Sequence, residues 1–180
     1  MRGVRFLGSP VSAFSWTSVR SMATRIAELG WHVQLQFGGS QLVELEDTLL
    51  DLPGKIIFDH YGRYLDPSFP DSGPGRVLSR LLDTGRCWLK LSGPYLITAS
   101  PDPDMPDVAV MARALARAYP ERLLWGSDWP HVGQPGGHDD AQILDLAKLW
   151  VEDAAARRRI FETNAAELYQ FDPIEAPVPG

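Results

Sequence analysis

Apolar positions along the chain alternate between short continuous runs and segments with helical spacing. In the helical segments, apolar residues fall three or four positions apart, as Val19, Ala23 and Ile26 do before a stop at Gly30. Because short apolar runs bounded by turn residues are typical of buried strands, we expect five strands. They are Val4–Phe6, Trp31–Gln36, Lys55–Phe58, Cys87–Leu91 and Leu123–Trp125.

A predicted helix follows every one of these strands. The later helices cover residues 42–49, 77–82, 108–118 and 143–150, and a last helix covers residues 154–169. Successive strands are separated by roughly 25–35 residues, as right-handed crossovers between parallel strands need. The pattern therefore predicts a parallel α/β sheet. Periodicity alone favours a doubly wound, flavodoxin-like sheet, because a closed eight-stranded barrel takes about 250 residues.

Length and composition restrict the classes of function. The 180 residues suit a single domain, which we place at residues 1–170 with a frayed tail at 171–180. The net charge of −6 and the lack of a dense Lys/Arg cluster argue against nucleic acid as a partner. No apolar run reaches roughly 18 residues, so no membrane span is expected. Cys87 is the single cysteine, which excludes an internal disulfide and favours a reducing, cytoplasmic location.

Polar and charged residues stand at the ends of the predicted strands. Because the carboxyl ends of parallel strands meet at one edge of a sheet, these side chains should gather on a common rim. The stretches are "GVRF", "KIIFDHYGR", "CWLKLSGPY" and "LLWGSDWPH", which carry Arg5, then Asp59, His60 and Arg63, then Lys90, Ser92 and Tyr95, and finally Asp128 and His131.

Each of these residues also has a structural interpretation. Asp59 alone is more often a helix cap or a loop brace than a catalytic group, and Ser92 is able to cap a turn. Arg63 could neutralise Asp59 or Asp66. The joint pattern is harder to explain in this way, because two histidine–carboxylate clusters each follow an apolar strand. We therefore favour a functional site at this rim.

The motifs "FDHYGR", "LKLSGPY" and "LLWGSDWPH" resemble the amidohydrolase superfamily, and in particular its branch of 2-pyrone-4,6-dicarboxylate lactonase-like hydrolases. The resemblance covers nearly the whole chain. It implies a (β/α)8 barrel in which the five strands are the fourth to the eighth, so that the chain is a partial barrel. The family's first strand carries a His-x-His pair that this sequence does not contain. Three βα units, on the order of 100 residues, would then precede Met1.

The resemblance also implies roles for individual residues. Asp128 matches the aspartate that activates the hydrolytic water, and His60 matches the histidine that polarises the scissile carbonyl. Arg5 matches an arginine that binds a substrate carboxylate. Four further residues lie on the same rim as candidate substrate-binding groups: Tyr95, Ser92, Arg63 and His131. The implied reaction is hydrolysis of the ester bond of a small anionic lactone.

The implied enzyme works without a metal or another cofactor, whereas some relatives use zinc or manganese. The missing His-x-His pair argues against a complete metal site here, since catalytic zinc usually has three protein ligands.

Two other hypotheses remain. An incomplete barrel would be inactive alone and would self-associate through its open sheet edges. A self-contained doubly wound domain could bind a small anion, although no Gly-rich phosphate loop follows the first strand.

Overall fold

Five parallel strands form one sheet in a computed structural model that describes residues 1–8, 14–134 and 138–171. The strands are β1 (Gly3–Leu7), β2 (His32–Gln36), β3 (Lys55–Phe58), β4 (Cys87–Leu91) and β5 (Leu123–Trp125). Each predicted strand is therefore confirmed to within about two residues, the usual scatter of element ends. The predicted tail at 171–180 lies outside the described residues except for Phe171.

The spatial order of the strands is the order of the chain, β1-β2-β3-β4-β5, and every neighbouring pair is parallel. A doubly wound sheet contains a point at which the strand order reverses. The described sheet has no such reversal. The flavodoxin-like alternative that periodicity favours is therefore wrong for the residues described here.

A helix follows each strand, as the spacing of apolar residues predicts. These helices are α1 (Trp16–Ala27), α2 (Leu42–Leu50), α3 (Gly73–Asp83), α4 (Pro106–Ala118) and α5 (Asp140–Trp150). Side chains fix two of the starts, because Ser72 accepts from the backbone of Gly75 and Asp139 accepts from Ala141. The connecting turns include η1 (Gly39–Gln41), η2 (His60–Arg63), η3 (Pro94–Leu96) and η4 (Pro120–Arg122).

The predicted last helix is divided into three pieces. They are α6 (Ala154–Arg158), a π-helical turn η5 (Arg159–Thr163) and α7 (Asn164–Tyr169). The side chain of Asn164 donates from Nδ2 to the carbonyls of Pro120 at 2.7 Å and Leu123 at 2.8 Å. This contact fixes α7 beside the start of β5, at the end of the sheet opposite the carboxyl ends of the strands.

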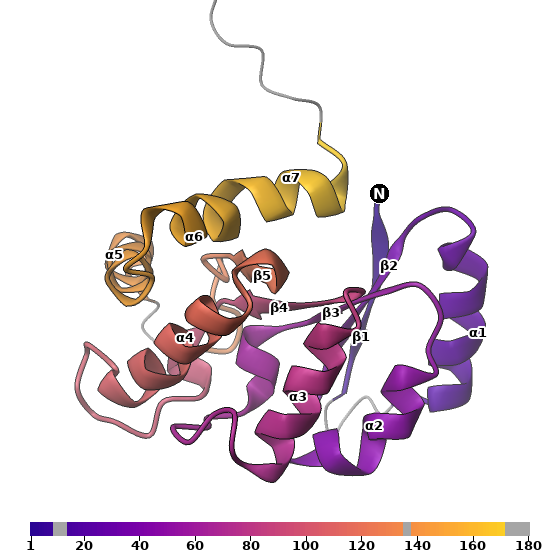
Figure 1. Cartoon of the computed structure of the whole chain (residues 1–180), viewed down its shortest axis with the longest axis horizontal. Coiled ribbons are helices and arrows are strands. Elements are labelled where there is room, and N and C mark those ends of the chain that lie inside the picture. The colour runs from indigo at the N-terminus through magenta and orange to yellow at the C-terminus, as the bar shows by residue number, and fades with distance from the viewer. Residues whose placement is uncertain (9–13, 135–137, 172–180) are drawn as a thin grey trace, which may run out of the picture.

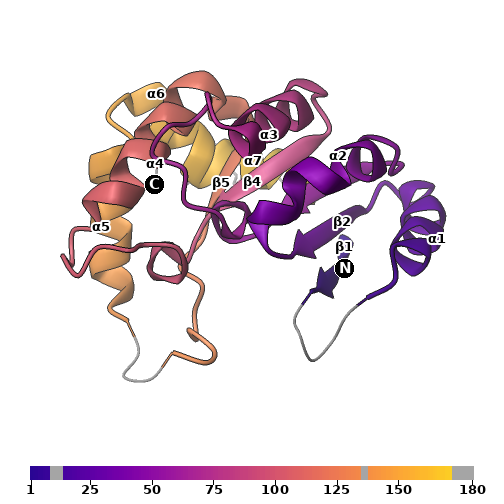
Figure 2. The ribbon, with the colours of Figure 1, turned by 90° about the horizontal axis from the view of Figure 1, so that it is seen from below.

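The sheet is covered differently on its two faces because successive strand residues point to opposite sides. On one face, residues such as Ile56 and Leu89 belong to the large core shared with α1 to α5. On the other face, Ile57 and Trp88 form a small cluster with Leu168 of α7. Figure 1 shows α7 across the sheet from α3, and Figure 2 shows α1 to α4 following one another along the outside.

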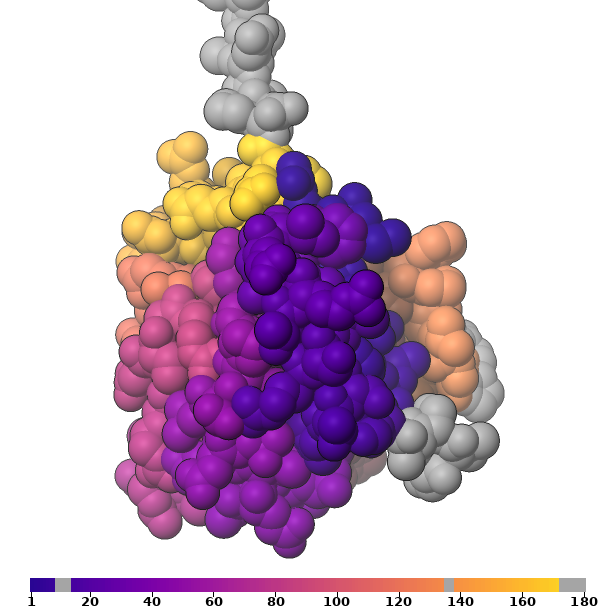
Figure 3. All heavy atoms as spheres, turned by 90° about the vertical axis from the view of Figure 1, so that its right-hand side faces the viewer, coloured from indigo at the N-terminus to yellow at the C-terminus, as the bar shows by residue number. Residues whose placement is uncertain are grey.

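The N-terminal strand and the C-terminal helix meet at the same end of the molecule. Arg2 donates to the carbonyl of Gln170 at 3.4 Å, and the rings of His32 and Tyr169 lie 5.3 Å apart. Figure 3 shows this meeting of indigo and yellow segments at the top of one face. Among the described residues, no helix has the length and apolar character needed to cross a bilayer.

Candidate active site

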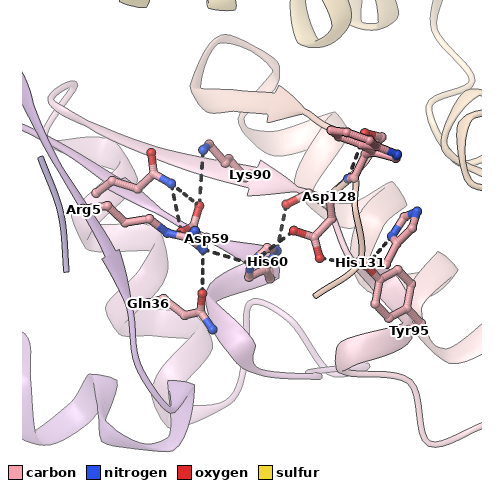
Figure 4. A network of polar contacts seen from close by, with 12 residues as sticks. Arg5, Gln36, Asp59, His60, Lys90, Tyr95, Asp128 and His131 are labelled. Carbon is pink, nitrogen blue, oxygen red and sulfur yellow. Dashed lines mark hydrogen bonds and ion pairs between the residues drawn. The ribbon is translucent and has the colours of Figure 1, made fainter. Parts of the chain in front are cut away.

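Side chains from three strand ends converge on one small region, drawn in Figure 4. His60 follows β3, Ser92 follows β4 and Asp128 follows β5. The Nδ1 atom of His60 lies 3.0 Å from the Ser92 hydroxyl, and its Nε2 atom lies 3.7 Å from Oδ1 of Asp128. The structure thus places His60 and Asp128 face to face, on the rim where the sequence predicts them.

Asp59 is the buried centre of the charged part of this region. Its side chain is 1% exposed and accepts from Nε of Arg5 at 2.8 Å. It also accepts from Nε2 of Gln34 at 2.9 and 3.0 Å, and Nζ of Lys90 lies 3.3 Å away. Asp59 makes no side-chain capping bond to η2, so its interpretation as a helix cap is wrong. It joins β1, β2 and β4 through three donor side chains.

Arg5 is held from two sides while part of its surface faces solvent. Besides Asp59, its Nη2 atom donates to Oε1 of Gln36 at 2.7 Å and approaches Nε2 of His60 at 3.4 Å. The Arg5 side chain remains 42% exposed. A guanidinium fixed in this way is oriented for a carboxylate without losing much further rotamer freedom.

His60 is uncharged at neutral pH in this environment. Burial lowers the pKa of His60 below its usual value of 6.5, and the charges of Arg5 and Arg63 act in the same direction. The carboxylates of Asp128 and Asp59 oppose this shift but do not cancel it. A neutral imidazole beside a carboxylate is a suitable partner for polarising a carbonyl group.

Asp128 is tied on its other side to an aromatic residue. The Tyr95 hydroxyl donates to Oδ2 of Asp128 at 2.7 Å and lies 2.7 Å from Nδ1 of His131. The Nε2 atom of His131 lies 3.0 Å from Oδ1 of Asp140 at the start of α5. Burial raises the pKa of Tyr95, as do its bond to Asp128 and the nearby charge of Asp140. The phenol therefore keeps its hydrogen at neutral pH.

The backbone around these side chains takes an uncommon conformation. Residues His60, Arg63, Asp128 and His131 have φ values of 50°, 54°, 69° and 58°. Non-glycine residues rarely adopt this left-handed region, and such strain gathers at functional sites. Gly93 also has a positive φ, and a Cβ atom there would lie 3.0 Å from Oδ2 of Asp128 and 3.2 Å from Nδ1 of His60. A side chain at this position would crowd both groups and strain the backbone.

A cavity of about 240 Å³ opens at this point. It is lined by Arg5, Gln34, Asp59, His60, Lys90, Ser92, Trp125, Gly126, Asp128 and Tyr169. A larger cavity of about 520 Å³ lies elsewhere, between α4 and the α5–α6 connection around Trp150. We assign function to the smaller one, because the convergent polar side chains lie there.

The structure brings together six of the seven predicted site residues. The exception is Arg63, whose side chain makes no hydrogen bond or ion pair with another described residue, although its charge influences His60. Within residues 1–8, 14–134 and 138–171, no group of three or more His, Cys, Asp or Glu side chains is arranged to hold a metal ion.

Sequence reasoning placed Lys90 at the rim without giving it a role, and it missed Gln34 and Gln36, which complete the charged part of the site. Gln34 and Gln36 stand at alternate positions of β2, after His32, and Lys90 is the one charged residue of the apolar strand β4. Side chains at every second position of a strand point to the same face of the sheet. Because Gln34 pairs in register with Arg5, these three side chains lie on the face that carries Arg5. The alternation in the sequence was a usable signal for all three.

Comparison with known proteins agrees with this geometry. The family model described as "Amidohydrolase" matches residues 1–171. The chain belongs to the amidohydrolase family. Its relatives place it in the lactonase-like branch of that superfamily, as the sequence motifs predict.

Three curated relatives carry names of lactone-converting enzymes. A D-galactarolactone isomerase of Agrobacterium fabrum is 30% identical over 177 residues, which are 97% of this chain and 60% of that protein. A 4-sulfomuconolactone hydrolase of Rhizobium radiobacter is 34% identical, over 94% of this chain and 58% of its own length. A 2-pyrone-4,6-dicarboxylate hydrolase of Comamonas testosteroni is 29% identical, with shares of 94% and 59%.

Solved structures show the same relation. An apo crystal structure from Agrobacterium tumefaciens, 30% identical in sequence, superposes with a TM-score of 0.85 and is covered over 61% of its length. In that comparison, 94% of this chain is matched. The amidohydrolase chain described here therefore spans about three fifths of the length of its relatives.

Proposed function

We propose that this amidohydrolase hydrolyses the ester bond of a small lactone that carries a carboxylate. The observation that carries the proposal is the placement of a carboxylate, a neutral imidazole and an oriented guanidinium around one cavity. Relatives that are named as lactone hydrolases support the same reaction class.

In this proposal Asp128 is the general base. It removes a proton from a water molecule while the water oxygen attacks the lactone carbonyl carbon, and a tetrahedral oxyanion forms. The ring C–O bond then breaks, and the proton held by Asp128 passes to the departing ring oxygen. The product is an open-chain hydroxy acid, so one water is consumed for each ester bond that is cleaved.

His60 and Arg5 act on different parts of the substrate. His60 lies 3.7 Å from Asp128, and its ring donates a hydrogen bond to the carbonyl oxygen as negative charge develops there. Arg5 binds the substrate carboxylate, and Lys90 adds a second positive charge at the cavity wall. Ser92, through its contact with Nδ1, fixes the plane of the His60 ring.

We further infer that the sheet is the fourth to eighth strands of a (β/α)8 barrel. The unreversed strand order and the superposition on a longer relative support this assignment. In a closed barrel, β1 and β5 would each pair with further strands. Without such strands, these edges favour self-association of the chain.

Lactone isomerisation is a second candidate, because a relative of 30% identity is named as an isomerase. The same base could activate a hydroxyl of the substrate in place of water, and the ring would then reclose on another oxygen. Hydrolysis at neutral pH releases a proton as the new carboxylic acid ionises, whereas isomerisation does not. Proton release therefore separates the two reactions.

Hydrolysis should depend on a carboxylate in the substrate and on Arg5. We expect lactones that carry a carboxylate to show a kcat/KM about 10-fold or more above that of their methyl esters, since a charge-assisted hydrogen bond contributes about 1.5–3 kcal/mol. Arg5→Gln should remove most of this difference. The measurement is proton release by each lactone pair with each protein.

Arg25→Gln, on the exposed outer side of α1, is the matched control and should keep the preference. Equal rates for acid and ester with the unmodified chain would contradict the assigned role of Arg5. Absence of proton release with every lactone would contradict the proposed function itself.

A further inference from the structure

The C-terminal helix contributes one side chain to the cavity of the candidate active site. Tyr169, the last residue of α7, lines this cavity together with residues from the strand ends. Its ring packs against the cluster that contains Ile57 and Trp88, and it lies 5.3 Å from the ring of His32 on β2. These residues share the face of the sheet that carries Arg5, and Figure 1 shows α7 lying across that face. Tyr169 therefore forms part of the cavity wall on this side.

Tyr169 is held in place by contacts that do not involve its hydroxyl group. Asn164, five positions earlier, fixes the start of α7 through two hydrogen bonds to carbonyls beside β5. Gln170 ends the helix with a φ of 55°, and its carbonyl accepts from Arg2 at 3.4 Å. The ring stands between these two anchors, so its position relative to the strands is set without the hydroxyl.

The hydroxyl of Tyr169 is available to a ligand. It makes no hydrogen bond with another residue that the structure describes, and its oxygen is not sealed from solvent. Burial raises the pKa of Tyr169, and the nearby charge of Asp59 acts in the same direction. The phenol therefore keeps its hydrogen at neutral pH and is a donor without a partner among the described residues.

Gln34 presents an acceptor to the same cavity. Its amide nitrogen donates to both carboxylate oxygens of Asp59, at 2.9 and 3.0 Å, which turns Oε1 away from that carboxylate. Within the described residues, Oε1 accepts no hydrogen bond, and it is also open to solvent. Gln34 follows His32 by two positions on β2, so it emerges on the face that Tyr169 covers. A donor and an acceptor that the proposed reaction does not use thus line one wall.

A lactone that fills this cavity displaces water from both groups. Polar groups that lose their water and gain no partner weaken binding, whereas a hydroxyl group satisfies either of them because it both donates and accepts. We propose that Tyr169 and Gln34 form a subsite for hydroxyl groups of the substrate, which is then a hydroxylated lactone acid. The role of this subsite in hydrolysis rests on the proposed function, whereas its preference in binding does not.

The first test measures binding to Asp128→Asn by titration calorimetry, so that turnover does not intervene. The probes are oxotetrahydrofuran carboxylate, a saturated lactone acid without hydroxyl groups, and its dihydroxy derivative. The dihydroxy lactone should bind about 10-fold or more tightly, because a site built for hydrogen bonds rejects a ligand that lacks them. Equal affinities, or no binding of the dihydroxy lactone, would overturn the proposal. If the unmodified chain hydrolyses no lactone, the proposed function fails while these affinities still decide the subsite.

The second test adds substitutions to the same protein. Tyr169→Phe keeps the packed ring and should lower the affinity for the dihydroxy lactone about 3- to 10-fold, the range for one neutral hydrogen bond, with no change for the unsubstituted acid. Tyr119→Phe is the matched control, because Tyr119 is also partly buried, packs on Phe69 and does not line the cavity. A loss of affinity that is equal for both lactones would show a structural role for Tyr169 and overturn the proposal.

The acceptor is tested separately, because the change at Gln34 also removes donors from Asp59. Gln34→Met keeps the length of the side chain, and its fold is checked first by circular dichroism. The folded variant should lose preference for the dihydroxy lactone by a similar factor. An unchanged preference would exclude Gln34 from the subsite, and Tyr169→Phe still decides the proposal if Gln34→Met does not fold.

Discussion

Asp128→Asn is expected to lower the rate of lactone hydrolysis by about 10²- to 10⁴-fold, the usual contribution of a general base. Asparagine keeps the size of the side chain and an oxygen for the Tyr95 hydroxyl, so the loss should come from the missing proton acceptor and not from the fold. The measurement is kcat from proton release, together with circular dichroism and a urea unfolding curve for the same protein.

The control for Asp128→Asn is Asp145→Asn, which removes an exposed carboxylate that pairs with Lys148. Its kcat should equal that of the unmodified chain. A rate within about twofold of normal for folded Asp128→Asn would exclude Asp128 as the base. His60 would then be the remaining candidate in the cavity, because its ring is neutral and faces the same space.

Asp59→Asn is expected to lower the free energy of unfolding by about 2–3 kcal/mol, the range for a lost buried hydrogen bond to a charged group. Every side-chain contact of Asp59 in the described site comes from a donor, namely Arg5, Gln34 or Lys90. An asparagine amide would turn two of its own hydrogens toward these donors. The two cations would also lose the negative charge that separates them.

The measurement is the urea midpoint at constant m-value, with Asp51→Asn as the control. Asp51 pairs with Arg20 on the surface and is 72% exposed, so its replacement should change the free energy by no more than about 0.5 kcal/mol. Equal urea midpoints for the two variants would contradict the claim that the Asp59 carboxylate stabilises the fold through Arg5, Gln34 and Lys90. A released Arg5 should also raise the KM for lactones that carry a carboxylate.

The strands and the rim of the site could be predicted because each depends on a short stretch of sequence once the sheet is parallel. A short apolar run followed by a polar residue fixes where a strand ends, and parallel strands bring such ends to one edge. His60 and Asp128 are far apart in the chain, yet this rule alone places them together. The strand order required more than periodicity, since periodicity cannot tell a reversing sheet from a continuous one.

The hydrogen-bond and ion-pair partners of Asp59 could not be predicted from the residues next to it in the sequence. Next to a predicted strand end, an aspartate has the local pattern of a helix cap. Its actual donors lie on β1, β2 and β4, and only the register of those strands brings them together. The break in the last helix had a similar origin, because Asn164 bonds to carbonyls beside β5 that lie more than 40 positions earlier.

The most direct test of the account is a crystal structure of Asp128→Asn with a lactone that carries a carboxylate. We predict that the lactone occupies the cavity beside β4 and β5, with its carboxylate on Arg5 and its ring carbonyl between His60 and residue 128. A lactone bound outside this cavity, or one whose carbonyl points away from both residues, would contradict the proposal that these strand ends form one hydrolytic site.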